Sequence, residues 1–421
     1  MNIAILNVIV FGTLFLYFHK TKKNNLIQFI TAEFLISAVC GIIHASSKEN
    51  TYYNLSLEGS IIIYSFFIIS IYPIYKYRGC NSFISNNKII ELINKILLIC
   101  SIYPFVISLI KIGNLLSSGN WINYLSNMHD ARFSSSGIME VSDSIYNLCI
   151  KAASWCKNIL PLLLIYNLQK YKKINKYTVG IILSQLTLII DSILTSTRFA
   201  IVDAMLSYVF TYYIVSNSIS GMAKSISFKI VKYLSIAIIS ALLIVTIGRS
   251  ITMGNKDFKS SIEWIALYGG EGMLNFNEYL IDQKITKGVD EIFPYLTSKE
   301  EITKQNKLDK ASEKNEWSLL TGKPENVFYT SYGSFVDSFG LKITYIILII
   351  TAICFSLVIN KRRNYMSNMA LIILYSRFIF MGFMYFPYYG VNGNKYLIQS
   401  LFIVILLYIS EKYERRKTIK Q

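Results

Sequence analysis

Long runs of apolar residues alternate with short polar segments along nearly the whole chain. Eleven of these runs approach the roughly 20 residues that an α-helix needs to cross the hydrocarbon core of a bilayer. The pattern therefore predicts an all-α protein, a polytopic bundle of about eleven transmembrane helices. The expected spans are residues 2–18, 26–44, 58–76, 90–111, 145–168, 177–195, 199–217, 229–248, 339–359, 368–387 and 395–410.

The composition supports a protein that is embedded in a lipid bilayer. Hydrophobic residues make up 53% of the 421 residues and charged residues only 16%, whereas soluble chains carry roughly 25% charged residues. This balance excludes a soluble enzyme, a disordered tail and a small disulfide-stapled domain. We expect one integral membrane domain over residues 1–421, in which the first span is retained because no small-residue cleavage site follows Phe18-His19-Lys20.

The positive charge of the chain, +17 at pH 7, lies mostly in short loops between the apolar runs. It forms no basic stripe beside a folded core, so nucleic acid is not an expected partner. The loops are alternately rich and poor in basic residues, which is the positive-inside pattern of membrane proteins. It predicts an external N-terminus and a cytoplasmic C-terminus. The short loops on the external side carry only Lys48, Arg198 and Lys395.

Two of the predicted external segments are too long to be simple connections. The first covers residues 112–144 and the second residues 249–338, and loops longer than about 15 residues usually have a function. In the second segment, residues 261–268 and 274–280 show apolar positions near helical spacing, and Gly269-Gly270 interrupts between them. We expect short helices here that lie along the outer membrane surface.

Several ionisable residues fall inside or at the ends of the predicted spans. Each costs about 2.5–3.5 kcal/mol on insertion scales, so each is a candidate for function. Glu33 and Lys95 could neutralise each other as a structural pair. Around one tight external turn, Asp191, Arg198 and Asp203 form either an ion cluster that pins two helices or a cavity in which Arg198 binds an anion.

Three arginines are expected at the outer half of the bundle: Arg198, Arg249 at the head of the large loop, and Arg377 within the tenth span. The guanidinium fork suits phosphate oxygens better than a lysine ammonium does. Together the three would suit a lipid-linked pyrophosphate. For Arg377 a buried structural ion pair is the alternative interpretation.

Motifs that are absent from the sequence restrict the chemistry. The chain has no Walker A loop, no HExxH, no GxSxG and no dinucleotide fingerprint. It has three histidines and six cysteines without a CxxC pair, which does not support a metal site or a disulfide framework. We therefore expect no cofactor and no metal.

Short motifs in a fixed order carry a resemblance to a known family. Ser196-Thr197-Arg198 opens a helix, and Gly248-Arg249-Ser250 stands at the head of the large loop. The later motifs are Tyr268-Gly269-Gly270, Asn275-Phe276-Asn277, Asn326-Val327-Phe328-Tyr329-Thr330 and Val336-Asp337-Ser338-Phe339-Gly340. This layout resembles the Wzy-type O-antigen and capsular oligosaccharide repeat-unit polymerases. The chain departs from the family in reading Asp-Ser-Phe-Gly where Asp-Phe-Gly is expected, and in lacking an external histidine beside it.

The resemblance implies a metal-independent membrane glycosyltransferase with a fold similar to the C-type glycosyltransferases. Such an enzyme joins oligosaccharide units linked to undecaprenyl pyrophosphate, a polyprenyl pyrophosphate, at the external face of the bacterial cytoplasmic membrane. The product is the O-antigen of lipopolysaccharide, capsule or exopolysaccharide. The expected partners are the polyprenyl-pyrophosphate-linked oligosaccharide, the lipid bilayer, and flippase and chain-length regulator proteins.

The resemblance also suggests roles for individual residues. Arg198, Arg249 and Arg377 would hold the pyrophosphate leaving group, and a carboxylate, Asp337, Glu271 or Asp203, would deprotonate the acceptor hydroxyl. Further candidates for contacts with the substrate are Arg132, His129, Asp203, Tyr268 and Tyr329. Two other functions stay open: a flippase or transporter of lipid-linked oligosaccharide, and an O-antigen ligase.

Overall fold

The computed structural model describes most of the chain. The described residues are 2–21, 25–47, 53–79, 88–117, 144–194, 198–252, 258–280, 286, 330–360, 364–381 and 391–420. In parts of the helices only the backbone is described. This concerns residues 47, 115–116, 192–194, 198–203, 234, 237–239, 241–252, 258–261, 264–265, 268, 381, 391–395, 415 and 417–420.

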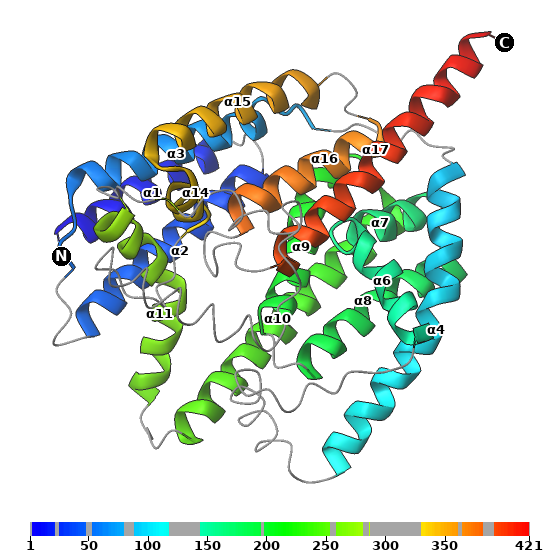
Figure 1. Ribbon diagram of the computed structural model, residues 1–421, viewed down its shortest axis with the longest axis horizontal. Helices are drawn as coiled ribbons and strands as arrows, with labels where there is room; N and C mark the ends of the chain where they lie inside the picture. The colour runs from blue at the N-terminus through cyan, green and yellow to red at the C-terminus, as the bar shows by residue number, and fades with distance from the viewer. Residues whose placement is uncertain are drawn as a thin grey trace. The chain divides into compact units, whose positions relative to one another are not determined.

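This part of the chain is helical and contains no β-strand, as the apolar pattern predicts. Each predicted span overlaps a helix (Figure 1). The α-helices are α1 Asn2–Lys20, α2 Asn25–Ser47, α3 Leu57–Lys76, α4 Lys88–Ser117, α6 Ser144–Cys156, α7 Leu160–Tyr171, α8 Lys176–Leu194, α9 Arg198–Val215, α10 Gly221–Thr252, α11 Phe258–Asn275, α14 Ser331–Phe339, α15 Leu341–Ile359, α16 Met366–Ser376 and α17 Val391–Lys420. Two π-helical segments, η1 Phe276–Leu280 and η2 Arg377–Met381, continue α11 and α16.

Six of the described helices are long and apolar enough to cross a membrane: α1, α2, α3, α4, α15 and most of α17. The pair α6–α7 counts as a seventh if its two parts form one span. The predicted spans 177–195, 199–217, 229–248 and 368–387 coincide with α8, α9, α10 and α16–η2, which are not among these seven. Within α9 and α16–η2, the apolar stretches Ala204–Val215 and Met366–Phe380 are shorter.

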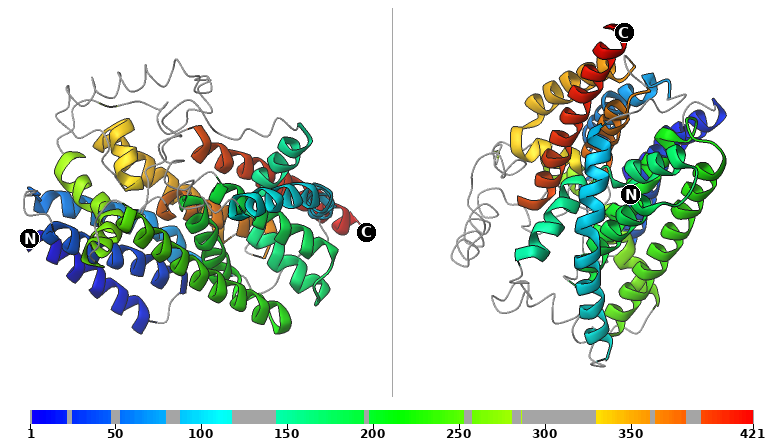
Figure 2. Two further views of the ribbon diagram at one scale, coloured as in Figure 1. Left: turned by 90° about the horizontal axis from the view of Figure 1, so that it is seen from below. Right: turned by 90° about the vertical axis from the view of Figure 1, so that its right-hand side faces the viewer.

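Two boundaries differ from the sequence prediction for local reasons. The predicted span 145–168 is bent by 79° between α6 and α7, and Pro161 in the first turn of α7 lacks the N–H that would continue the ladder of α6. The span expected from residue 339 instead begins at Leu341. Gly340 takes a φ of +78°, which separates the short helix α14 from α15. In contrast, α4 remains one continuous helix through Pro104 (Figure 2).

The described contacts divide the chain into two compact units. Unit 1 contains Met1–Tyr77, Met253–Lys361 and Tyr375–Lys395, and unit 2 contains the remaining residues. The units are described separately below. The prediction of a single integral membrane domain stays a prediction.

In unit 1, specific contacts fix the directions of the helices. Tyr64 of α3 donates a hydrogen bond of 2.6 Å to Asn7 of α1, and Phe18 near the end of α1 packs against Tyr75 near the end of α3. These two helices are therefore parallel. By the same reasoning α15 is parallel to α3: Ser65 lies 2.5 Å from the Tyr345 hydroxyl, and the Asn360 amide donates to the Lys76 carbonyl at 2.9 Å.

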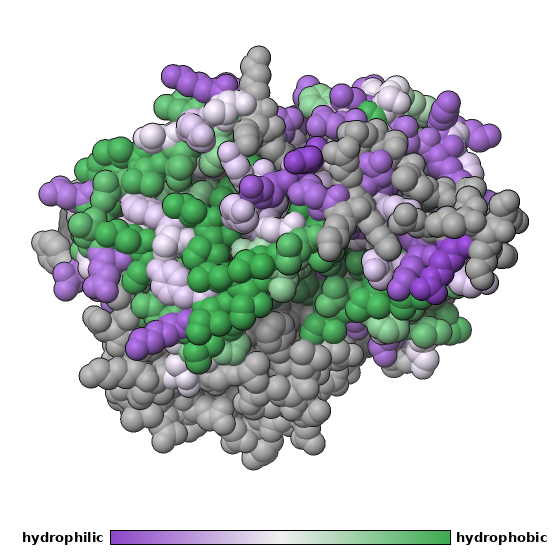
Figure 3. Space-filling view, turned by 90° about the horizontal axis from the view of Figure 1, so that it is seen from above, coloured by the Kyte–Doolittle hydropathy of each residue, from purple (hydrophilic) through white to green (hydrophobic). Residues whose placement is uncertain are grey.

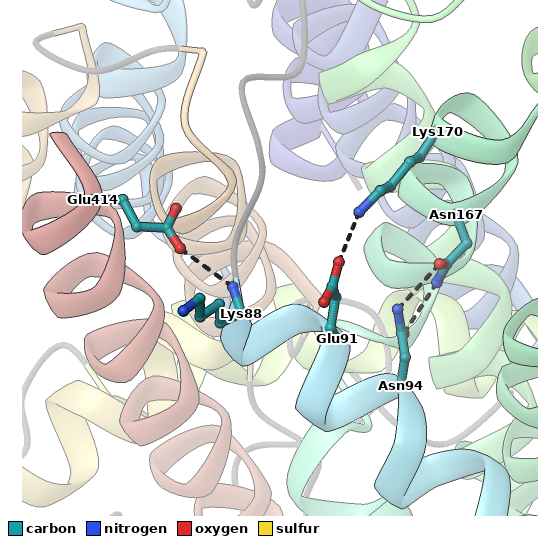
Figure 4. Close-up of polar contacts among 6 residues, drawn as sticks. All are labelled: Lys88, Glu91, Asn94, Asn167, Lys170 and Glu414. Carbon is teal, nitrogen blue, oxygen red and sulfur yellow. Dashed lines mark hydrogen bonds and ion pairs between the residues drawn. The ribbon is translucent and has the colours of Figure 1, made fainter. Parts of the chain in front are cut away.

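In unit 2, α4 and α7 are antiparallel, and a row of polar contacts joins the start of α4 to the end of α7 (Figure 4). Asn94 and Asn167, both buried, exchange two hydrogen bonds of 3.0 Å. One turn earlier on α4, Glu91 forms an ion pair of 3.1 Å with Lys170. The backbone N–H of Lys88 also donates to Glu414 of α17, so the end of α17 meets the start of α4.

Exposed apolar side chains follow the outward faces of the long helices, and wide apolar areas are visible on the face shown in Figure 3. On α15 these side chains recur every three or four residues, at Ile343, Ile346, Ile350, Ile353 and Leu357. A soluble protein would not leave a stripe of this length uncovered. A face of this kind is suited to contact lipid.

Candidate functional site

The helix α11, which belongs to the predicted large external loop, is held closely against α2. The Ser37 hydroxyl of α2 donates a hydrogen bond of 2.6 Å to the Gly269 carbonyl. A Cβ atom added at Gly270 would lie 2.1 Å from the backbone nitrogen of Gly41. Small residues therefore let the two backbones touch, as in tightly packed membrane helices.

This packing corrects the expectation that Gly269-Gly270 interrupts the helix. One continuous helix runs from Phe258 to Asn275 and passes through both glycines. Glycine lowers helix stability by about 1 kcal/mol relative to alanine, and here the contact with α2 compensates for that weakness. Spacing along a single sequence cannot identify such a contact, because it depends on a segment more than 200 residues away.

After α11, the π-helical segment η1 is anchored to the start of α3 through Asn277. The Asn277 Oδ1 atom accepts a hydrogen bond of 2.7 Å from the Ser56 backbone N–H. Its Nδ2 atom donates to the Ser56 carbonyl at 2.9 Å and to the Ser60 hydroxyl at 3.1 Å. Ser56 is itself the N-cap of α3. The buried amide thus fixes η1 against the segment that precedes α3.

Around this anchor lies a group of titratable side chains that we name the acid–phenol cluster. Its members come from the end of α2, the segment before α3 and the α11–η1 helix: His44, Tyr53, Glu271, Glu278 and Tyr279. The His44 Nε2 atom lies 3.0 Å from the Tyr53 hydroxyl. His44 is buried, whereas the other four side chains are partly exposed.

Burial and neighbouring groups shift the pKa values of side chains in the acid–phenol cluster. Burial raises the pKa of Tyr53, and the negative charge of Glu271 raises it further, with smaller effects from Tyr279 and Glu278. Burial also raises the pKa of Glu278, against the opposing effect of hydrogen bonds with the Asn54 backbone and Tyr279. The phenol of Tyr53 therefore keeps its proton at neutral pH and can act as a hydrogen-bond donor.

A second group lies in the interior of unit 1, where α14 meets η2. Every residue from Thr330 to Ser338 is buried, although the stretch contains five polar or charged side chains. Asp337 is 2% exposed and Arg377, the first residue of η2, is 4% exposed. Charged groups at such depth occur where they are paired or contact a polar ligand.

The contacts between α14 and η2 indicate how these two charges are arranged. The Ser331 hydroxyl donates a hydrogen bond of 2.6 Å to the Ile379 carbonyl, and the rings of Phe335 and Phe378 lie 5.3 Å apart. The helix α14, which carries Asp337, therefore packs against η2, which begins at Arg377.

The two groups are connected through aromatic side chains. Phe276 of η1 packs against Phe66 of α3 with ring centroids 6.2 Å apart, and Phe66 packs against Tyr332 of α14 at 5.5 Å. Both π-helical segments therefore belong to one packed region of unit 1. Segments of π-helix occur frequently at functional sites.

The structure answers the site predictions only in part. Glu271, Asp337 and Arg377 all belong to unit 1, Glu271 in the first group and the other two in the second. Arg198 is the first residue of α9, Asp203 follows one turn later and Arg249 lies near the end of α10, all in unit 2, but the side chains of these three residues lie outside the described part. The convergence of the three arginines stays a prediction.

Other candidates lie outside the described residues. This holds for His129 and Arg132 of the first external segment, for Tyr329, and for the side chain of Tyr268, whose backbone belongs to α11. Among the described residues, no group of three histidine, cysteine, aspartate or glutamate side chains could hold a metal ion.

The structure adds local detail on three of the predicted charges. Glu33 of unit 1 is buried and Lys95 of unit 2 is exposed, and their pairing stays a prediction. Asp191 accepts a hydrogen bond of 3.3 Å from Tyr146. Sequence reasoning missed His44, Tyr53 and Glu278, and the only available signal was their position next to predicted external helix ends.

Comparisons with known proteins add no identity. No family model, no curated protein and no solved structure matches this chain.

Proposed function

We propose that this protein is a Wzy-type oligosaccharide repeat-unit polymerase of the bacterial cytoplasmic membrane, with eleven spans and a fold similar to the C-type glycosyltransferases. The proposal combines the order of motifs in the sequence with one structural observation. Arg377 and Asp337, both buried, lie on elements that contact each other although they are 40 residues apart. A buried guanidinium in an apolar bundle suits a phosphate-containing lipid.

The directions of the helices are consistent with the eleven-span topology in each unit by itself. In unit 1, the predicted third and ninth spans, α3 and α15, are parallel. In unit 2, the predicted fourth and sixth spans, α4 and α8, are parallel: Gly180 of α8 meets Leu98 of α4, and Tyr146 contacts both Ser108 and Asp191. Strict alternation across a membrane requires both relations.

Glycosyl transfer from a lipid diphosphate develops negative charge on the leaving group. In the proposed mechanism, Arg377 stabilises that charge together with Arg198 and Arg249. Loss of one well-placed charge stabiliser commonly lowers the rate about 10²–10³-fold. The low dielectric of the surroundings strengthens this interaction relative to water.

The decisive experiment uses the purified full-length protein in lipid vesicles with lipid-linked repeat units as the sole substrate. A ladder of polymer lengths on a gel supports the polymerase. Movement of the units across the vesicle membrane without new glycosidic bonds identifies a flippase, and transfer only to an added lipid A-type acceptor identifies a ligase. The Arg377→Ala protein should lose the ladder, whereas Lys173→Ala, an exposed basic residue, should retain it.

A further inference from the structure

We propose that the acid–phenol cluster binds the acceptor sugar and that Glu271 is the general base that deprotonates its attacking hydroxyl. This inference rests on the proposed function and deepens it, because three carboxylates, Asp337, Glu271 and Asp203, are candidates for the base on sequence grounds.

The geometry brings the five members together from segments that are distant in the sequence. Gly41 of α2 contacts the Gly270 carbonyl and Leu274, so His44, one turn after Gly41, lies beside the last turn of α11. Asn277 fixes the other side through its hydrogen bonds to Ser56. Tyr53 lies between these two attachments and contacts His44 at 3.0 Å.

The chemistry of the cluster fits a carbohydrate. Sugars present several hydroxyl groups that donate to carboxylates and accept from phenols, and their apolar faces pack on aromatic rings. Glu271 and Glu278 supply carboxylates seven residues apart, and Tyr53 and Tyr279 supply phenols. Partial exposure of these four side chains leaves them accessible.

Accessibility also separates Glu271 from Asp337. A general base must come within about 3 Å of the hydroxyl that it deprotonates, and Asp337 is 2% exposed in a helix that is buried from Ser331 to Ser338. Glu271 lies on the partly exposed side of α11, directly after the glycines that lock this helix on α2. Asp337 is better placed to orient Arg377.

In the proposed step, the acceptor hydroxyl oxygen forms a bond to C1 of the donor sugar. The bond between C1 and the diphosphate oxygen breaks, and its electron pair leaves with the lipid diphosphate. Glu271 takes the hydroxyl proton and later releases it to water. Tyr53, held by His44, and Glu278, held by the Asn54 backbone, position the acceptor ring.

The test separates donor from acceptor in a single-transfer assay. The donor is a lipid-diphosphate-linked repeat unit blocked at its non-reducing end, and the acceptor is a repeat unit joined to lipid through a non-transferable C-glycosidic link. Glu271→Gln should lower kcat about 10²–10⁴-fold with an unchanged KM for the acceptor. Glu278→Gln should instead raise that KM about tenfold through loss of a charge-assisted hydrogen bond.

The matched control is Glu263→Gln, which removes a carboxylate two turns earlier on the same helix and should leave both constants unchanged. A second variant, Glu271→Ala, is assayed with added formate, which can replace the missing carboxylate but cannot repair a packing defect. Formate should restore turnover if the missing group is a base, and no restoration at normal protein level contradicts the inference. Wild-type kcat in Glu271→Gln also contradicts it, whereas failure of the wild-type protein to transfer contradicts the proposed function instead.

Discussion

The close approach of α11 to α2 makes Gly270→Ala the most informative single substitution. The added Cβ atom would lie 2.1 Å from the Gly41 nitrogen, 2.4 Å from the Cys40 carbonyl carbon and 2.5 Å from the Gly41 Cα atom. All three neighbours are backbone atoms, so no side chain can rotate away. The helix α11 must move as a body.

The size of the effect follows from these distances. Opening the shortest contact from 2.1 Å to 3.4 Å, the lower limit of ordinary contact, requires a shift of 1.3 Å. The same shift along the Ser37–Gly269 hydrogen bond would lengthen it from 2.6 Å to 3.9 Å, which breaks it. Overpacking costs about 1–3 kcal/mol and the lost bond about 0.6 kcal/mol, while alanine regains about 1 kcal/mol of helix propensity. We expect a net destabilisation of about 2 kcal/mol.

The same interface supplies the control. A Cβ atom added at Gly41 meets its nearest neighbours, the Gly270 carbonyl and Leu274, at 3.6 Å, which is ordinary contact. Gly41→Ala should therefore be neutral or slightly stabilising. Thermal unfolding in detergent, followed by the transfer assay at equal protein level, measures both variants. Equal stability of the two would refute the argument that backbone contact determines this packing.

Three further predictions concern polar contacts. Asn94→Ala should lower the free energy of unfolding by about 1 kcal/mol because the buried amide of Asn167 loses its hydrogen-bond partner. In the same unfolding assay, the double variant Asn94→Leu/Asn167→Leu should lose less stability than the sum of the two single leucine variants. Additive losses would contradict this. Asn277→Ala should lower the free energy of unfolding by about 1–3 kcal/mol and reduce the rate of glycosyl transfer, because η1 loses its hydrogen bonds to Ser56 and Ser60. Thermal unfolding and the transfer assay check both effects, and unchanged values of both would contradict the prediction. Arg377→Lys keeps the charge but loses the fork, and it should retain more polymer on gels than Arg377→Ala; equal ladders from both would contradict a role in binding phosphate.

The sequence predicted much of the helical architecture because apolar runs of membrane length are a strong and local signal. It predicted the positions of α1 to α4 and α15 within a few residues, except where α4 continues beyond the expected end. It could not predict the bend between α6 and α7 or the separate helix α14, because Pro161 and Gly340 act through backbone geometry rather than through hydropathy.

The candidate site was less accessible to sequence reasoning for a different reason. Arg377 and Asp337 could be selected because a charge inside an apolar run is unusual. His44 and Tyr53 have no such signal: each becomes notable only through its contact with the other and its proximity to α11–η1. Long-range packing creates the acid–phenol cluster, and no spacing rule within one segment contains that information.

Helix directions also bear on the number of spans, independently of hydropathy. Because α3 and α15 are parallel in unit 1, the chain must cross the membrane an odd number of times between them if both are spans. The two long apolar candidates in that interval, α4 and the α6–α7 pair, provide only an even number. Some of the helices α8, α9 and α10 must therefore cross as well. All three crossing gives five passes, the number that the eleven-span topology requires.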